Sequence, residues 1–153
     1  MRGARPVPWH LEDPVGFADD HLVPLVDTGL GNSAYLVDLG DGRALAVDAS
    51  RDLRALRTAA GRRGLTVAFA ADTHLHADFV TGATQLAADD GATVLASAAG
   101  RRTFDHRGLA DGDEVDLGGL TLRTLATPAT PTNTCPSSSS TAHGRWASSP
   151  AAR

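Results

Sequence analysis

The sequence has no lysine, a single cysteine and no long apolar run. All 14 basic residues are arginines, they form no basic cluster, and 18 acidic residues leave a net charge of −4. A chain with this charge balance is not expected to bind nucleic acid. One cysteine, Cys135, cannot form an internal disulfide, which favours a reducing, cytoplasmic location. No apolar stretch approaches the roughly 20 residues that span a bilayer, so we expect no membrane contact.

Short apolar runs separated by turn signals predict several strands. Residues 34–37 and 44–47 flank Gly40-Asp41-Gly42, which is typical of a hairpin turn. Further apolar runs cover residues 22–26, 65–72 and 92–97. Residues 106–128 predict a turn followed by another hairpin. The residues expected on the buried side of that hairpin are Val115, Leu117, Leu120, Leu122 and Leu125.

Two segments between these strands have helical spacing. Ser50 is the expected N-cap of the first helix, which runs to Gly61. The second helix is expected to start at Phe79 and to end before Gly91. The apolar positions with this spacing are Leu53, Leu56 and Ala60 in the first, and Phe79, Ala83, Leu86 and Ala87 in the second. Because strands alternate with helices, the fold class is an α/β layered domain with a mixed sheet.

The two ends of the chain differ from the part between them. Residues 1–21 are predicted to be an irregular lead-in, and residues 22–134 to form the domain. Residues 135–153 contain four consecutive serines, show no apolar periodicity and are predicted to be an irregular tail. Because serine codons shifted by one base encode aliphatic residues, we interpret this tail as an out-of-frame remnant of a further strand. The nucleotide sequence tests that hypothesis.

The residues that carry chemistry lie at the end of the strand over residues 65–72, in "DTHLHADF". His74 and His76 are two apart, so in extended backbone their side chains point the same way. Asp78 follows at the start of the next helix, where its carboxylate can turn back toward the two histidines. Imidazole and carboxylate together make a mixed nitrogen and oxygen site for zinc or iron. The alternative is a polar strand-to-helix loop in which Asp78 caps the helix.

"THLHADFVTGATQLA" resembles the T-H-x-H-x-D-H metal motif of the metallo-β-lactamase superfamily. With Phe79 in the last place, it resembles the persulfide dioxygenase (sulfur dioxygenase) branch, close to glyoxalase II. The resemblance extends over residues 22–134. It implies an αβ/βα sandwich, incomplete at the C-terminus, with a metal at the upper edge of the two sheets.

The resemblance also implies which metal to expect. Phe79 cannot ligate, which disfavours a two-zinc site and favours a single Fe(II) bound by two histidines and a carboxylate. His74 would be the iron ligand from the motif. His76 and Asp78 complete the motif's metal-site residues and would line the site or orient water and His74. Asp48 supports the motif in one interpretation and is a turn residue in the other, which we favour.

The chain departs from this family pattern after Pro128. The second histidine should lie in a T-P-G-H-T-P loop, but residues 127–131 are T-P-A-T-P. The later aspartate ligand is also absent. Of the later histidines, we expect His106 to be a surface residue and His143 to lie in the irregular tail.

Three functions therefore stay open. The first is an Fe(II) persulfide dioxygenase acting on glutathione persulfide or a similar small thiol derivative, in a family often fused to rhodanese domains. The second is a zinc-dependent thioester hydrolase of glyoxalase II type. The third is a truncated, non-catalytic domain, which we favour for the chain as it stands because two expected ligands are missing.

Overall fold

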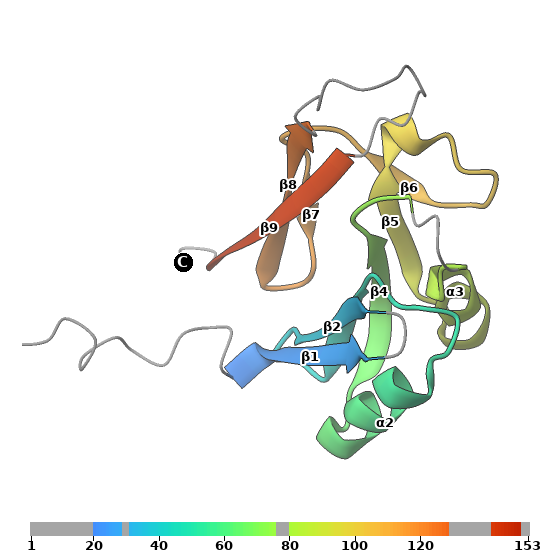
Figure 1. Ribbon diagram of the computed structural model, residues 1–153. Helices are drawn as coiled ribbons and strands as arrows, with labels where there is room; N and C mark the ends of the chain where they lie inside the picture. Colours follow the sequence, from blue (N-terminus) through green and yellow to red (C-terminus); the bar gives the residue numbers. More distant parts are fainter. Residues whose placement is uncertain (1–19, 29–30, 76–79, 129–141, 151–153) are drawn as a thin grey trace, which may run out of the picture.

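The computed structural model of the chain describes residues 20–28, 31–75, 80–128 and 142–150. Two β-sheets and two α-helices make up most of it (Figure 1). The first sheet has six strands in the order β1-β2-β3-β4-β5-β6, and the second has three in the order β7-β8-β9. The strands of the first sheet are β1 (Leu22–Asp27), β2 (Asn32–Asp38), β3 (Arg43–Val47), β4 (Thr66–Asp72), β5 (Thr93–Ser97) and β6 (Arg107–Leu109).

The first sheet is mixed, as its sequence pattern predicts. β1, β2 and β3 pair antiparallel, and the turn at Gly40 and Gly42, both with positive φ, confirms the predicted hairpin. From β3 onward the strands pair in parallel. Parallel strands need a crossover, and α2 and α3 provide two of them. A short 3-10 turn, η1 (Ala98–Gly100), follows β5.

Helix α2 (Arg54–Arg63) starts and ends later than predicted. Ser50 is not its N-cap; that position is Leu53, and no side chain caps the helix. Ser50 instead forms an isolated bridge with Thr81, because the chain after β3 continues along the sheet edge before it turns. The helix passes Gly61 and ends at Gly64, which takes the left-handed conformation that favours glycine.

Helix α3 (Ala83–Asp90) also starts later than predicted, at Ala83 rather than at Phe79. Its end at Gly91 is as predicted, with Gly91 in the left-handed conformation. Gly82 precedes the helix and allows a close approach, since a Cβ there would lie 2.3 Å from the carbonyl oxygen of Ser50. Any larger residue at position 82 would therefore push α3 away from the end of β3.

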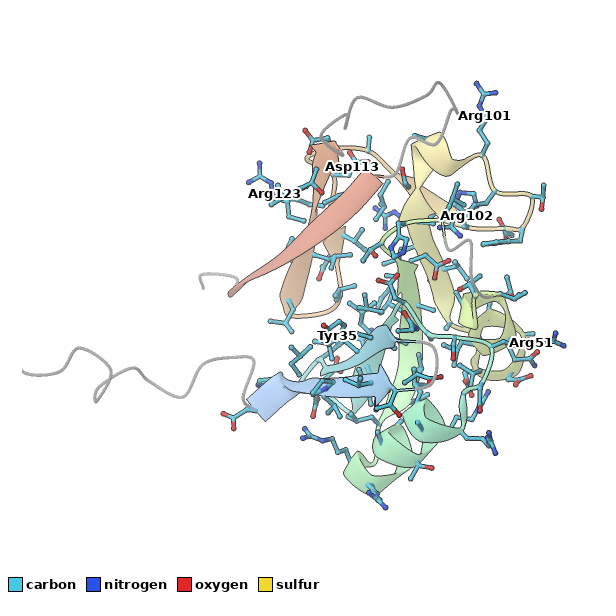
Figure 2. All side chains as sticks on the ribbon, viewed as in Figure 1. Tyr35, Arg51, Arg101, Arg102, Asp113 and Arg123 are labelled. Atoms are coloured by element: carbon cyan, nitrogen blue, oxygen red, sulfur yellow. The ribbon has the colours of Figure 1, made fainter. Side chains whose placement is uncertain are left out.

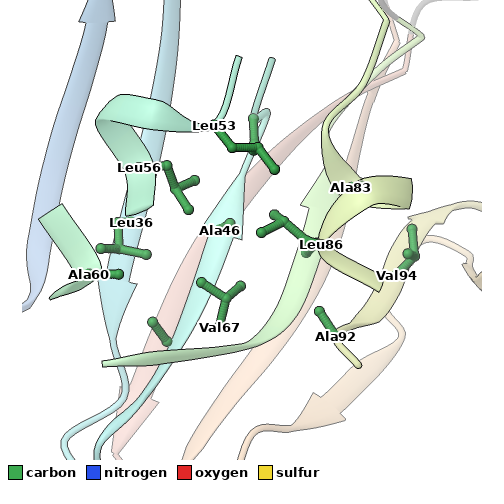
Figure 3. Close-up of a cluster of buried hydrophobic side chains, with 13 residues drawn as sticks. Leu36, Ala46, Leu53, Leu56, Ala60, Val67, Ala83, Leu86, Ala92 and Val94 are labelled. Carbon is green, nitrogen blue, oxygen red and sulfur yellow. The ribbon is translucent and has the colours of Figure 1, made fainter. Parts of the chain in front are cut away.

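Both helices pack on one face of the first sheet. Alternate residues of β3 point to opposite faces, so Ala44 and Ala46 contact the helices while Leu45 and Val47 face the second sheet. Figure 3 shows the helix-side core, in which Leu36 and Leu86 are fully buried. The predicted apolar helix positions Leu53, Leu56, Ala60, Ala83 and Leu86 are all buried in this core.

The second sheet covers the opposite face. It consists of β7 (Glu114–Asp116), β8 (Leu120–Pro128) and β9 (Ala142–Pro150). Val115, Leu117 and Leu122 are buried against the first sheet, as predicted, while Leu120 is partly buried. The predicted α/β sandwich is thus confirmed as three layers, in which the first sheet lies between the helices and the second sheet. In the described part of the chain no helix covers the outer face of the second sheet.

Strand β9 corrects the prediction for the tail. Residues 135–153 were predicted to be irregular, yet Ala142–Pro150 pairs antiparallel with the whole length of β8. Pairing uses backbone groups, so the free edge of a nine-residue strand can be covered without apolar alternation in the partner. The remainder of the tail lies outside the described residues, as does nearly all of the lead-in.

The lengths of the helices bear on the expectation that the chain does not contact a membrane. The longest described helix, α2, has ten residues, about half the length needed to cross a bilayer, and no described helix qualifies as a membrane span.

Candidate metal centre

Strands β3, β4 and β5 end at the same edge of the first sheet. Val47 is paired with Ala71, and Asp72 with Ala96, so the residues after each strand lie side by side. His74 follows β4 at this edge. In α/β sheets the carboxyl ends of parallel strands are where ligands gather. The predicted position of the motif at a strand end is thereby confirmed for the residues up to Leu75.

Asp48 supports the motif from the end of β3. It is 7% exposed and has φ of 51°, a left-handed conformation that aspartate tolerates better than most residues. Its amide donates to the carbonyl oxygen of Ala71 at 2.8 Å. Its carboxylate accepts two hydrogen bonds from Thr73, from the amide at 2.7 Å and from the hydroxyl. Of the two interpretations given above, the structure therefore favours support of the motif over a simple turn residue.

These contacts suit one tautomer of the His74 ring. The Thr73 hydroxyl donates its proton to Asp48. The contact of 2.9 Å between Thr73 Oγ1 and His74 Nδ1 then fits a ring whose Nδ1–H donates to the hydroxyl oxygen. A neutral imidazole protonated at Nδ1 has its lone pair on Nε2, the atom through which it would bind a metal. The chain Asp48–Thr73–His74 is thus compatible with ligation through Nε2.

Three further residues at this edge were not identified from the sequence. Asp72 accepts hydrogen bonds from Thr81 Oγ1 at 2.8 Å and from Arg102 Nη1 at 2.8 Å. Arg102 also donates to the carbonyl oxygen of His74 at 3.0 Å. The signal for Asp72 was present, since it is the one carboxylate in an otherwise apolar strand. Arg102 lies 30 positions away in a polar loop, and nothing in its surroundings distinguishes it from Arg101.

Two predicted metal residues cannot be compared with the structure. His76 and Asp78, together with Phe79, lie outside the described residues, so their roles remain predictions. Among the residues that the structure does describe, no three histidine, cysteine, aspartate or glutamate side chains form a metal cluster. What the described part fits is the first ligand, because Thr73 and Asp48 hold the His74 ring through its Nδ1 and leave Nε2 as the atom that would face a metal.

The end of β8 reaches the same edge from the second sheet. The turn before β8 is fixed near the start of β3, where Arg43 Nη2 donates to the Leu117 carbonyl oxygen at 2.7 Å. Toward the other end of β8, the amide of Ala126 donates to Asp111 at 2.8 Å. Asp111 follows β6, which runs parallel to β5 and ends at the edge of the motif. The Thr-Pro-Ala-Thr-Pro segment therefore begins where the resemblance requires the second histidine.

The two later histidines differ from expectation in their surroundings. His106 is half-buried rather than a plain surface residue. Its Nδ1 lies 2.8 Å from the Phe104 carbonyl oxygen, and the two rings meet edge to face with centroids 5.7 Å apart. His143 lies in β9, where the backbone register places it opposite Thr127.

A cleft of about 580 Å³ lies between the β1–β2 end of the first sheet and the start of α2. Its walls are the β1–β2 end, including Asp27 and Asn32, and the start of α2, including Leu53 and Leu56. Ser50, also on the wall, bridges to Thr81 next to the motif. Its volume is within the range of small-molecule sites.

Comparison with known proteins agrees with this architecture. The chain is 36% identical over 117 residues to a hydroxyacylglutathione hydrolase of Acidiphilium cryptum, a match that covers 74% of the chain and 45% of that protein. It therefore spans less than half the length of this curated relative. No protein-family model matches the sequence.

Two solved structures are similar to this chain in both fold and sequence. ETHE1 from Myxococcus xanthus superposes with a TM-score of 0.64 at 31% identity, covering 70% of this chain and 48% of that one. A metallo-β-lactamase from Staphylococcus aureus superposes with a TM-score of 0.64 at 30% identity, covering 70% and 34%. In each case the chain corresponds to part of a longer protein.

Proposed function

This chain belongs to the metallo-β-lactamase superfamily, and we propose that it is part of a mononuclear iron domain that acts on small thiol-derived persulfides. The observation that carries this proposal is the hydrogen-bond chain Asp48–Thr73–His74. It engages Nδ1 of His74, and a neutral ring protonated there would offer the Nε2 lone pair to a metal. Thr73 and His74 would have no need of the buried Asp48 carboxylate beneath them if they served only a surface loop.

The choice of iron and persulfide rests on the resemblance of "THLHADF" to the persulfide dioxygenase motif. Phe79 removes a ligand that a second metal ion would use. His74 would hold the iron, with His76 and Asp78 lining the site. The iron would supply the redox chemistry by which O2 oxidises the persulfide sulfur.

A zinc-dependent thioester hydrolase is the second candidate. It is favoured by the 36% identity to a hydroxyacylglutathione hydrolase. Zinc accepts the same imidazole ligand, and its chemistry would be activation of a water for attack on the thioester. Phe79 counts against it, because the two-metal hydrolases of the superfamily carry histidine there.

As it stands, the chain is proposed to bind metal weakly. The Thr-Pro-Ala-Thr-Pro segment starts at the motif edge but supplies no histidine. A metal held mainly by His74 and its neighbours would lack a ligand from the second sheet.

Metal analysis combined with two activity assays separates these functions. The purified chain would be loaded with Fe(II) or Zn under anaerobic conditions and tested for O2 uptake with glutathione persulfide and for hydrolysis of a hydroxyacylglutathione. Stoichiometric iron with O2 uptake supports the dioxygenase. Zinc with thioester hydrolysis supports the second candidate and contradicts the first, and absence of bound metal shows a non-catalytic domain.

A further inference from the structure

Arg102 is a buried cation beside the motif. Its side chain is 5% exposed, and its partner Asp72 is fully buried, with 2.8 Å between Nη1 and Oδ2. Burying an ion pair is costly, and apolar residues often serve stability equally well. A pair in this position therefore needs an explanation other than the stability of the fold. Figure 2 shows that the neighbouring Arg101 points outward, away from the sheet.

The guanidinium of Arg102 joins two points of the motif segment. While Nη1 contacts the Asp72 carboxylate at the end of β4, Nη2 donates to the carbonyl oxygen of His74 at 3.0 Å. The plane of the group also lies over the ring of Phe104, 5.6 Å from its centroid. A planar group with two fixed donors thus sets the distance between the strand end and the backbone of His74.

Asp72 extends this connection to the far end of the motif. Its second oxygen accepts a hydrogen bond from Thr81 Oγ1 at 2.8 Å. Thr81 Oγ1 in turn accepts from the amide of Ala83, the first residue of α3, at 3.1 Å. The Asp72 carboxylate therefore holds residues on both sides of the motif, and Arg102 neutralises the charge of that carboxylate.

We propose that Arg102 is a positioning residue of the metal site, which holds the His74 backbone and the Asp72 carboxylate in place between the two ends of the motif. The inference rests on the proposed function, since it assigns a role in metal binding. Arg102 lies in the loop after β5, which contains none of the motif residues. A residue outside the motif would thus control the position of the metal ligand His74. Arg102 Nε makes no hydrogen bond in the described structure, so the two Nη contacts carry the role.

Charge alone cannot replace this geometry. A lysine at position 102 can pair with Asp72, but its single ammonium cannot also keep the directed contact with the His74 carbonyl oxygen. Arg102→Lys therefore separates neutralisation of Asp72 from positioning of His74. Arg102→Gln removes both, and Arg101→Gln is the matched control on the adjacent, exposed arginine.

The first measurement uses the metal-free protein. Hydrogen exchange of the Thr73 and Gly82 amides, which donate to Asp48 and Ala49, reports on the two sides of the motif. The Leu65 amide, bonded to Ala60 at the end of α2, is the remote reference. We expect Thr73 and Gly82 to exchange at least tenfold faster in Arg102→Gln, with Leu65 unchanged. We expect no change at any of the three in Arg101→Gln.

The second measurement is metal affinity, by titration with Fe(II) and Zn. Loss of a residue that orients a ligand costs about 10-fold to 100-fold in affinity, and we expect this in both Arg102 variants. Arg102→Lys should keep the melting temperature closer to wild type than Arg102→Gln does. If Arg102→Gln does not fold, Arg102→Lys and the charge-free double variant Arg102→Gln/Asp72→Asn provide the same comparison.

Failure of the inference and failure of the proposed function give different results. If the wild-type chain binds no metal, the proposed function is wrong, and amide exchange in the metal-free protein decides the role of Arg102. If wild type binds metal and both Arg102 variants bind it equally well with unchanged exchange, Arg102 is only structural and the inference is wrong.

Discussion

In the proposed metal site the end of β4 and the end of β8 would meet at the same metal, and the two strand ends are held in different ways. At the end of β4, Thr73 and His74 rest on the buried carboxylate of Asp48. At the end of β8, the amide of Ala126 is bonded to Asp111, an exposed residue. The first set of contacts is continuous with the core, so losing it would cost stability as well as function. The second is peripheral, so a histidine can be lost there without damage to the fold.

The largest effect is expected from Asp48→Ala, which tests the stronger half of this comparison. The change leaves the Thr73 amide and hydroxyl without their acceptor and places alanine at positive φ. Hydrogen bonds to a charged group contribute about 1.5–3 kcal/mol each, so we expect about 3 kcal/mol of destabilisation in urea unfolding. A loss below about 1 kcal/mol would show that the motif is not held through Asp48.

Asp48→Asn is the matched variant, because asparagine also tolerates positive φ. Its amide group would donate to Thr73 Oγ1, freeing the hydroxyl proton for His74 Nδ1. The ring should then change to the tautomer protonated at Nε2, which ¹⁵N NMR of the imidazole detects. An unchanged tautomer would contradict the assigned hydrogen-bond chain.

The second prediction tests the end of β8, the strand end with the weaker contacts. Replacing Ala129 by Gly-His restores the loop pattern that the family resemblance requires, at the edge where β8 ends. We expect metal affinity to rise about 100-fold, equivalent to about 2.8 kcal/mol, measured by competition with a chelator. His143→Ala is the control, since His143 lies opposite Thr127 in the register. If this control alone abolishes metal binding in the unmodified chain, the end of β8 is not deficient.

A smaller effect is expected from Asp111→Ala. Asp111 is exposed, and water can replace it as the acceptor for the Ala126 amide. The free energy of unfolding should fall by less than about 1 kcal/mol, clearly less than in Asp48→Ala. If the two variants lost equal free energy of unfolding, the ends of β4 and β8 would not differ in how firmly they are held.

The smallest effect concerns an ion pair outside both regions. Arg54 lowers the pKa of Asp52 from its usual 3.8 to about 2, chiefly through side-chain hydrogen bonds. A lowered pKa stabilises the fold above the unfolded value, so this contribution is present above about pH 4 and is lost as the pH falls to about 2. Since both side chains are exposed, Asp52→Asn should differ only slightly from wild type in melting temperature at pH 7. The difference should vanish at pH 2, and persistence there would contradict the lowered pKa.

Much of the first sheet was predictable because its signals are local. Apolar runs, the turn at Gly40 and Gly42, and Gly91 after α3 depend only on neighbouring residues, and these elements formed where predicted. The helix starts were wrong because a competing contact decides them. Ser50 and Thr81 bridge across the sheet edge, so neither helix begins until the chain has left it. β9 was missed because strand pairing depends on a free neighbouring edge rather than on its own sequence.

The sequence by itself determined the superfamily, the place of His74 at a strand end and the absence of a histidine from residues 127–131. Each of these is a property of residue identity and short-range order along the chain. Only the tertiary structure decided how His74 is held. Asp48, Thr73 and His74 come from two strands, and Arg102 comes from a third segment. Their contacts exist because parallel pairing brings the carboxyl ends of β3, β4 and β5 to one edge, a long-range arrangement that no local pattern encodes.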